Sequence, residues 1–228
     1  MEEGVESLDQ LARFLQYRLE EFPYVIVTLI IAFSVHEFAH ALVAYKFGDS
    51  TAKNQGRLTL NPLKHLDPVG TILIFFAGFG WARPVPVNRF FFKNPRLAGI
   101  LVSVAGPLSN LLLAVLAYLA WYSMLAFGIA ENMQLGLMDF FNIFIQLNMV
   151  LFVFNLLPFP PLDGYRIIED VVPNHIRPRL TQYESYGVLI FLILVVTPLY
   201  QYTIYPIMNI VIPFFANGLN DFFSGLFS

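Results

Sequence analysis

Long apolar runs separated by short polar connections dominate the hydrophobic pattern of this chain. A helix needs roughly 20 apolar residues to cross about 30 Å of hydrocarbon. This criterion predicts three membrane spans at residues 24–46, 97–127 and 137–157, followed by C-terminal spans from residue 186. Pro198 interrupts the last stretch, so the number of crossings after residue 186 stays open. The predicted fold is an all-α polytopic membrane protein, a bundle of about four to six transmembrane helices.

A shorter apolar run at residues 69–81 differs from these spans. It is too short for a comfortable crossing and is loosened by several glycines, so we expect it to be re-entrant. The stretch that follows alternates in polarity and contains two prolines, which predicts an extended, β-hairpin-like segment. The expected re-entrant region therefore covers residues 69–95, within a single domain of residues 24–228.

The first 23 residues are expected to form an amphipathic segment that precedes this domain. We expect its helix to end near Pro23, because proline does not continue a helix. The acidic start lacks the basic and apolar regions of a cleaved signal peptide, so we expect it to stay in the mature chain.

The composition is typical of a membrane protein and limits both its expected partners and the residues that could bind a metal. Hydrophobic residues make up 57% of the chain and charged residues only 13%, far from the averages of soluble proteins. A net charge of -3 offers no basic surface for nucleic acid, which is not an expected partner. The chain has no cysteine, so any metal must bind through His, Asp or Glu.

The basic residues predict the orientation of the spans. Cytoplasmic connections near membrane ends are enriched in Lys and Arg, whereas the connection around Glu131 has neither and is expected outside. Because basic residues flank the run at 69–81 on both sides, it is expected to enter and leave by one face. Eleven of the thirteen cations follow the first and third spans: Lys46, Lys53, Arg57, Lys64, Arg83, Arg89, Lys93, Arg96, Arg166, Arg177 and Arg179.

The first span contains the sequence HEFAH, from His36 to His40. Positions i and i+4 lie on one helix face, so both imidazoles can bind one metal while Glu37 lies beside it. Zinc needs at least three protein ligands and leaves one position for water, whose proton a neighbouring carboxylate accepts. The alternative is a hydrogen-bonded cluster between helices, because polar groups in an apolar span need partners.

Two histidines leave a zinc site one ligand short, and the candidates are His65, His175 and the carboxylates. Asp163 stands out because it follows an apolar span within NLLPFPPLDG, where prolines and Gly164 break the helix and can aim a carboxylate back into the bundle. A solvated turn aspartate at a membrane exit remains the alternative for this residue.

These motifs together resemble the site-2 protease family of intramembrane zinc metalloproteases. HEFAH and N-x-x-P-x-x-P-L-D-G carry the resemblance, and AGPLSN at residues 105–110 and GWARPVPVN at residues 80–88 also resemble motifs of that family. The resemblance implies that His36, His40 and Asp163 bind one zinc ion and that Glu37 is the catalytic acid/base. It also implies a compact bacterial-type member, since the chain lacks a PDZ-like or CBS-like domain.

Two asparagines, Asn110 and Asn155, lie in the predicted spans, where an amide is usually a structural hydrogen-bond partner. We interpret Asn110 in this way. For Asn155, the resemblance implies contact with the substrate or its oxyanion, and a structural role remains the alternative.

The resulting hypothesis is a zinc metalloendopeptidase that hydrolyses peptide bonds within or next to transmembrane segments of other membrane proteins. Its expected partners are a transmembrane protein or peptide substrate and the lipid bilayer. It is expected in the bacterial cell membrane with its active site toward the cytoplasmic side. The alternatives are a metal-ion transporter or channel and a noncatalytic scaffold of the same fold.

Overall fold

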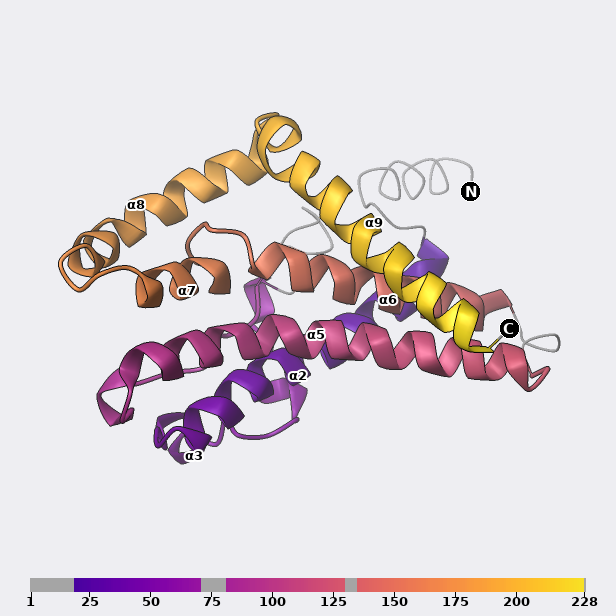
Figure 1. Ribbon diagram of the computed structural model, residues 1–228, viewed down its shortest axis with the longest axis horizontal. Helices are drawn as coiled ribbons and strands as arrows, with labels where there is room; N and C mark the ends of the chain where they lie inside the picture. Colours follow the sequence, from indigo (N-terminus) through magenta and orange to yellow (C-terminus); the bar gives the residue numbers. More distant parts are fainter. Residues whose placement is uncertain (1–18, 71–80, 130–134, 228) are drawn as a thin grey trace, which may run out of the picture.

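A computed structural model of the protein describes residues 19–70, 81–129 and 135–227. This described part contains helices and no strand, so the predicted all-helical fold is confirmed. Figure 1 shows the long helices gathered along one axis, with α5 running the length of the molecule. The elements are η1 (Leu19–Glu21), α2 (Phe22–Lys46), α3 (Thr51–Asn54), η2 (Pro62–Lys64), η3 (Arg89–Phe91), α5 (Pro95–Ala126), α6 (Leu135–Asn155), α7 (Asp163–Val171), α8 (Arg177–Val196) and α9 (Tyr200–Phe227).

Local sequence explains where the long helices begin. Pro23, Pro95 and Pro178 each occupy the first turn of a long helix, where a missing N–H costs no hydrogen bond. The side chain of Asn94 also caps α5 by accepting a hydrogen bond from the Leu97 N–H. Pro23 therefore lies in the first turn of α2, directly after η1, while residues 1–18 of the predicted N-terminal segment lie outside the described residues.

Within the described residues, five helices are long and apolar enough to cross a membrane: α2, α5, α6, α8 and α9. The first three occupy the stretches expected at residues 24–46, 97–127 and 137–157 to within two residues. Helix α8 begins at Arg177, nine residues before the start expected from hydropathy. Its polar first half is held to α7 by side-chain contacts, so the helix extends beyond its apolar run.

Helices α2, α5 and α6 pack together and form the centre of the bundle. Val25, Leu29 and Phe33 of α2 pack against Ile143 of α6. A second cluster joins the other end of α2 to the start of α5 through Ala44, Ala98 and Val102. Within a bilayer such contacts act through close van der Waals packing, and the small side chains of Ala44 and Ala98 let α2 and α5 approach each other closely.

Helices α8 and α9 follow one another along the outside of this bundle (Figure 1). The first packs along α7, and Phe191 near its end stacks on Phe159. Helix α9 then continues beside α5 in the same direction, since Tyr118 bonds to Ala216 and Tyr122 to Asn220. The two C-terminal helices therefore do not fold back on each other as an antiparallel hairpin.

Residues 71–80 of the expected re-entrant region lie outside the described residues, but both ends of that segment are defined. A Cβ atom on Gly70 would lie 2.2 Å from the Trp81 carbonyl oxygen, so the two ends are in contact. One isolated antiparallel bridge joins Leu66 to Ala82, and it is the only strand-like pairing in the described part of the chain. The segment therefore begins and ends at one place beside α2.

Candidate metal centre

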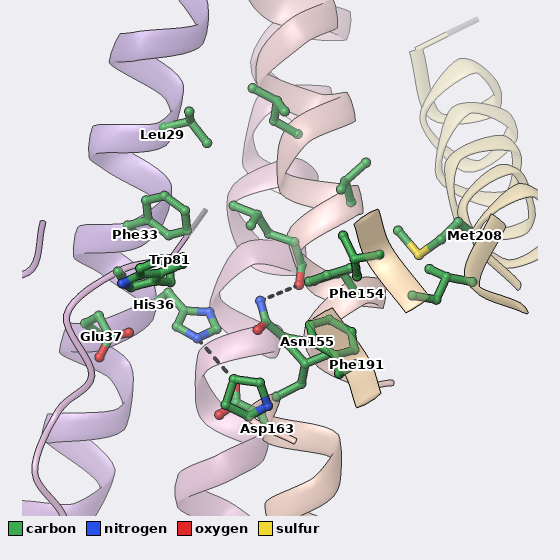
Figure 2. A pocket seen from close by; sticks show the side chains of 18 of the residues that line it. Leu29, Phe33, His36, Glu37, Trp81, Phe154, Asn155, Asp163, Phe191 and Met208 are labelled. Carbon is green, nitrogen blue, oxygen red and sulfur yellow. Dashed lines mark hydrogen bonds and ion pairs between the residues drawn. The ribbon is translucent and has the colours of Figure 1, made fainter. Parts of the chain in front are cut away.

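Three potential metal ligands converge between α2, α5 and α7. His36 and His40 lie one turn apart on α2, with their Nε2 atoms 3.0 Å from each other. The Asp163 Oδ2 atom lies 3.2 Å from the first Nε2 and 3.3 Å from the second. Figure 2 shows His36 and Asp163 pointing toward each other from their two helices. The structure thus brings together the three residues that the sequence suggested as a ligand set.

Hydrogen bonds at the far side of each ring determine which nitrogen carries the proton. The Nδ1 atom of His40 lies 2.6 Å from the Val102 carbonyl oxygen, which can only accept. The His40 Nδ1 atom must therefore be the donor, and in the neutral ring Nε2 then holds a lone pair directed at Asp163. This is the arrangement by which proteins prepare a histidine to bind a metal.

The same argument holds for His36 through a chain of amides. Its Nδ1 atom lies 2.7 Å from Oδ1 of Asn110, whose Nδ2 group donates to Oδ1 of Asn148 at 3.1 Å. Asn148 in turn donates to the Phe144 carbonyl oxygen at 2.8 Å. Because a carbonyl oxygen can only accept, the chain has one direction and His36 must donate from Nδ1. Both Nε2 lone pairs therefore face the same point.

A glycine on α5 makes room for the two rings. A Cβ atom on Gly106 would lie 2.3 Å from the His40 Nε2 atom and 2.6 Å from the His36 Cε1 atom. Any other residue at this position would displace the imidazoles. Gly106 lies in the AGPLSN motif, where a glycine in a membrane span predicts a close approach of helices, but the motif does not indicate that the imidazoles are the groups approached.

The sharp turn between α6 and α7 positions Asp163. Helix α6 ends at Asn155, and Asp163 is the first residue of α7, where the helix dipole favours a negative charge. A Cβ atom on Gly164 would lie 2.3 Å from the Leu156 carbonyl oxygen, so only glycine lets α7 start this close to the end of α6. The turn directs the carboxylate back toward α2, as the break at NLLPFPPLDG predicted.

The geometry and chemistry of this ligand set fit zinc. Zinc bonds of about 2.0–2.1 Å in a tetrahedral site place neighbouring ligand atoms about 3.3 Å apart, close to the separations observed here. Asp163 Oδ2 is buried and makes no hydrogen bond with any described residue, which is costly unless a cation neutralises it. Two neutral imidazoles and one carboxylate are a common set of zinc ligands.

Glu37 lies beside this cluster, on the adjacent face of α2. It is buried, and its Oε2 atom accepts a hydrogen bond from the Val85 N–H at 2.9 Å. Val85 belongs to the extended segment that follows Trp81, and Arg57 holds that segment by donating to the carbonyl oxygens of Arg83 and Pro84. Burial lowers the pKa of Arg57, and attraction to Glu37 opposes that change. Glu37 is therefore held in place by a neighbouring part of the backbone.

The cluster opens into a cavity of about 960 Å³ between α2, α6, α8 and α9. His36, Glu37, His40 and Asp163 line it together with apolar side chains such as Leu29 and Phe33 (Figure 2). Further polar side chains, among them Gln146 and Asn209, also line the cavity. A mainly apolar cavity that also contains polar groups suits a peptide with apolar side chains.

Asn155 lines the same cavity near Asp163 (Figure 2). Its Nδ2 group donates to the Leu151 carbonyl oxygen at 2.9 Å within its own helix. The amide oxygen has no hydrogen bond to any described residue, so it remains able to accept one. Both interpretations given for Asn155 fit this arrangement.

Several residues that orient the ligands could not be identified from sequence. Asn148 and the carbonyl group of Val102 have no motif of their own, and their importance depends on which helices are neighbours. Asn110 was assigned a structural role. It has that role, and its partner is a metal-ligand candidate.

The helices and this cluster define a class: a helical membrane protein with a buried His–His–Asp site suited to zinc. Comparison with known sequences identifies the family. The sequence profile described as "Peptidase family M50" matches residues 122–197, which include Asp163. No solved structure shows significant similarity to the chain.

Named relatives extend the match beyond that region. A Bacillus subtilis (strain 168) protein named "Putative zinc metalloprotease YwhC" is 63% identical over 199 residues, covering 86% of this chain and 91% of the relative. Proteins named "Putative zinc metalloprotease Rip2" are 33% identical in Mycolicibacterium smegmatis and 35% in Mycobacterium tuberculosis strain H37Rv, each match covering 78% of this chain and 68% of the relative. The chain belongs to peptidase family M50, and the family expected from its motifs is confirmed.

Proposed function

We propose that this protein is an intramembrane zinc endopeptidase that cuts peptide bonds within or next to the transmembrane segments of other proteins. The observation that carries the proposal is the convergence of His36, His40 and Asp163 on one point, with both imidazole lone pairs directed there. Family membership and the names of the relatives, which include zinc metalloprotease, agree with it.

In this proposal His36, His40 and Asp163 hold a single zinc ion. Bound zinc lowers the pKa of a water molecule to about 7 and polarises the scissile carbonyl group. Asn110 and the Val102 carbonyl group keep each imidazole in the tautomer that can bind metal.

Glu37 is the proposed catalytic acid/base. The Val85 N–H occupies its Oε2 atom, and Oε1 makes no hydrogen bond to a described residue. Oε1 can therefore accept a proton from the attacking water and deliver it to the leaving amine nitrogen. The hydrogen bond to Oε2 restricts rotation of the carboxylate while this happens.

The apolar cavity supports a membrane-embedded substrate. A helical peptide hides its carbonyl groups in hydrogen bonds, so a transmembrane substrate must unwind before its scissile bond can reach the site. Segments with glycine, proline or polar residues unwind most easily. Asn155 is the proposed contact for the unwound backbone, since its free amide oxygen can accept an N–H that has lost its helical partner.

We also propose that the active site lies toward the cytoplasmic side of the bacterial cell membrane. The support is the clustering of eleven of thirteen cations in the connections after the first and third spans. Asp163 lies in the connection that follows the third span, and His40 lies less than two helical turns before the end of the first span at Lys46.

The alternatives receive less support from the site. A transporter distributes ion-binding groups along a route, whereas the described residues contain one group of three ligands at one point. A scaffold has no need of two histidines held in the metal-binding tautomer. We therefore put forward no second function.

The test uses the purified full-length protein in detergent, with zinc content and peptide cleavage measured on the same samples. Wild type is expected to contain one zinc and to cut a transmembrane peptide with a central glycine or proline. Glu37→Gln should keep its zinc and lose about 10²- to 10⁴-fold in rate, because only the proton acceptor is removed. Zinc-loaded wild type that cuts no membrane peptide, or a zinc-loaded Glu37→Gln variant that cuts normally, would contradict the proposal.

A further inference from the structure

A second aspartate on α7 lies seven residues after Asp163. Positions i and i+7 of a helix share one face, and this spacing separates Asp163 and Asp170 by about 10.5 Å along the axis. Asp170 is almost fully buried against α5. The face of α7 that presents one aspartate to the histidines therefore presents another to the neighbouring helix.

Helix α5 carries two close approaches with the same spacing. A Cβ atom on Gly99 would lie 2.1 Å from the Asp170 Oδ2 atom, just as one on Gly106 would meet the ring of His40. Gly99 and Gly106 are also seven residues apart. Asp170 thus fits into a notch of α5 at the level of Gly99, and the metal centre lies at the level of Gly106.

Two arginines from other elements hold Asp170 in this notch. Arg89 donates to Oδ2 at 2.9 Å, and Arg177 at the start of α8 donates to Oδ1 at 2.8 Å. Burial raises the pKa of Asp170, and both arginines act against that rise. Removing one member of such a buried ionic group is strongly destabilising, because it leaves an uncompensated charge.

Arg89 also links this contact to the segment that holds Glu37. It follows the extended stretch of Val85, whose end is fixed where the Asn88 N–H donates to Asp49 Oδ2 at 2.6 Å. Asp170 therefore joins α5, α7, α8 and the connection beside Glu37 at one point. These contacts restrict both sliding and rotation of α7 against α5.

We infer that Asp170 is a positioning residue for the metal centre. By fixing the height and rotation of α7 against Gly99, it places the Asp163 carboxylate within bonding reach of a zinc ion held by the two histidines. This inference rests on the ligand role proposed above for Asp163, but not on proteolytic activity. Its test is accordingly a measurement of zinc affinity.

The experiment is a double-mutant cycle on the full-length protein in detergent, with zinc affinity measured by competition with a chromophoric chelator. Asp170→Asn keeps the size of the side chain and removes its charge. We expect it to weaken zinc binding by about 10-fold or more, because a shift or rotation of α7 would move the Asp163 carboxylate out of bonding distance, with an effect like that of losing a group that orients a ligand. In an Asp163→Ala background the same change should cause no further loss, because Asp170 acts through Asp163.

Asp221→Asn is the matched control, since this exposed residue of α9 is remote from α7 and should bind zinc like wild type. If Asp170→Asn does not fold, Arg89→Lys, which keeps the positive charge but changes the geometry of the contact with Asp170, is the milder variant and carries the same expectation. A folded Asp170→Asn protein with zinc affinity within about twofold of wild type would overturn the inference. So would a double mutant whose loss of zinc affinity equals the product of the two single-mutant losses. Normal affinity in Asp163→Ala alone would instead reject the proposed ligand set.

Discussion

The backbone N–H of Val85 donates to the side chain of Glu37 across 48 positions of sequence, at 2.9 Å. This bond ties the proposed acid/base to a segment of the chain that is not part of its own helix. We predict that Val85→Pro, which removes the donor, lowers the rate of peptide cleavage by about 10- to 100-fold. The loss corresponds to about 1.5–3 kcal/mol for a hydrogen bond to a charged group.

Zinc content should stay at the wild-type level in Val85→Pro, because no ligand is touched. Val87→Pro makes the same change two residues further on, where no hydrogen bond from the N–H is found among the described residues, and should keep most of the activity. Equal losses of cleavage rate in the two variants would show that the damage comes from disturbing the extended segment and not from losing the hydrogen bond to Glu37.

Asn110 should be needed for tight metal binding. Asn110→Ala removes the acceptor of the His36 Nδ1–H and frees the ring to rotate or change tautomer. We expect zinc affinity to fall by about 10- to 100-fold when measured by chelator competition. Asn142→Ala on the exposed side of α6 is the control and should leave affinity unchanged. Unchanged affinity in Asn110→Ala would mean that the ring is oriented by other contacts.

Two glycine substitutions should act in opposite directions. Gly106→Ala places a methyl group against both imidazoles, so we expect loss of zinc and destabilisation by about 1–3 kcal/mol. A Cβ atom on Gly218, inside α9, would meet no atom within 4 Å, so Gly218→Ala should stabilise the protein by about 0.5–1 kcal/mol. Thermal unfolding of the two variants in one detergent compares them directly. A neutral Gly106→Ala would show that α5 can withdraw from α2 at little cost.

The cation pattern makes a prediction about orientation. The chain has no cysteine, so single cysteines can be labelled with an impermeant reagent on the native background. Lys93→Cys and Arg179→Cys should react only from the cytoplasmic side, and Phe127→Cys at the opposite end of α5 only from outside. Labelling of Lys93→Cys and Phe127→Cys from the same side would reject the proposed topology.

The sequence predicts the positions of side chains best where the deciding interactions are local. His36, Glu37 and His40 lie within five residues of one predicted helix, so the spacing alone places both imidazoles on one face. Asp163 was harder, because its position depends on a turn, and the turn was recognisable only from its prolines and Gly164. The early start of α8 was missed because hydropathy does not register ionic contacts such as that between Arg166 and Glu184.

The orienting groups lay beyond the reach of sequence because they depend on tertiary packing. Asn148 matters only because α6 passes beside Asn110, and the carbonyl group of Val102 has no identity in a sequence at all. No sequence motif distinguishes Asp170 from the other acidic residues of the connections. Only its burial against Gly99 distinguishes it from a solvated side chain.

The matched seven-residue spacings on α5 and α7 also limit how such a chain can change length. One inserted residue between Gly99 and Gly106 would turn one notch by about 100° from the other and move it by about 1.5 Å. A deletion between Asp163 and Asp170 would do the same to the two carboxylates. Neither helix can therefore gain or lose a residue in this stretch by itself. Length variation among active relatives should therefore be confined to the connections outside these two intervals. A relative whose alignment needs a gap inside either interval would be a protein in which the residue equivalent to Asp170 is out of register with the metal centre.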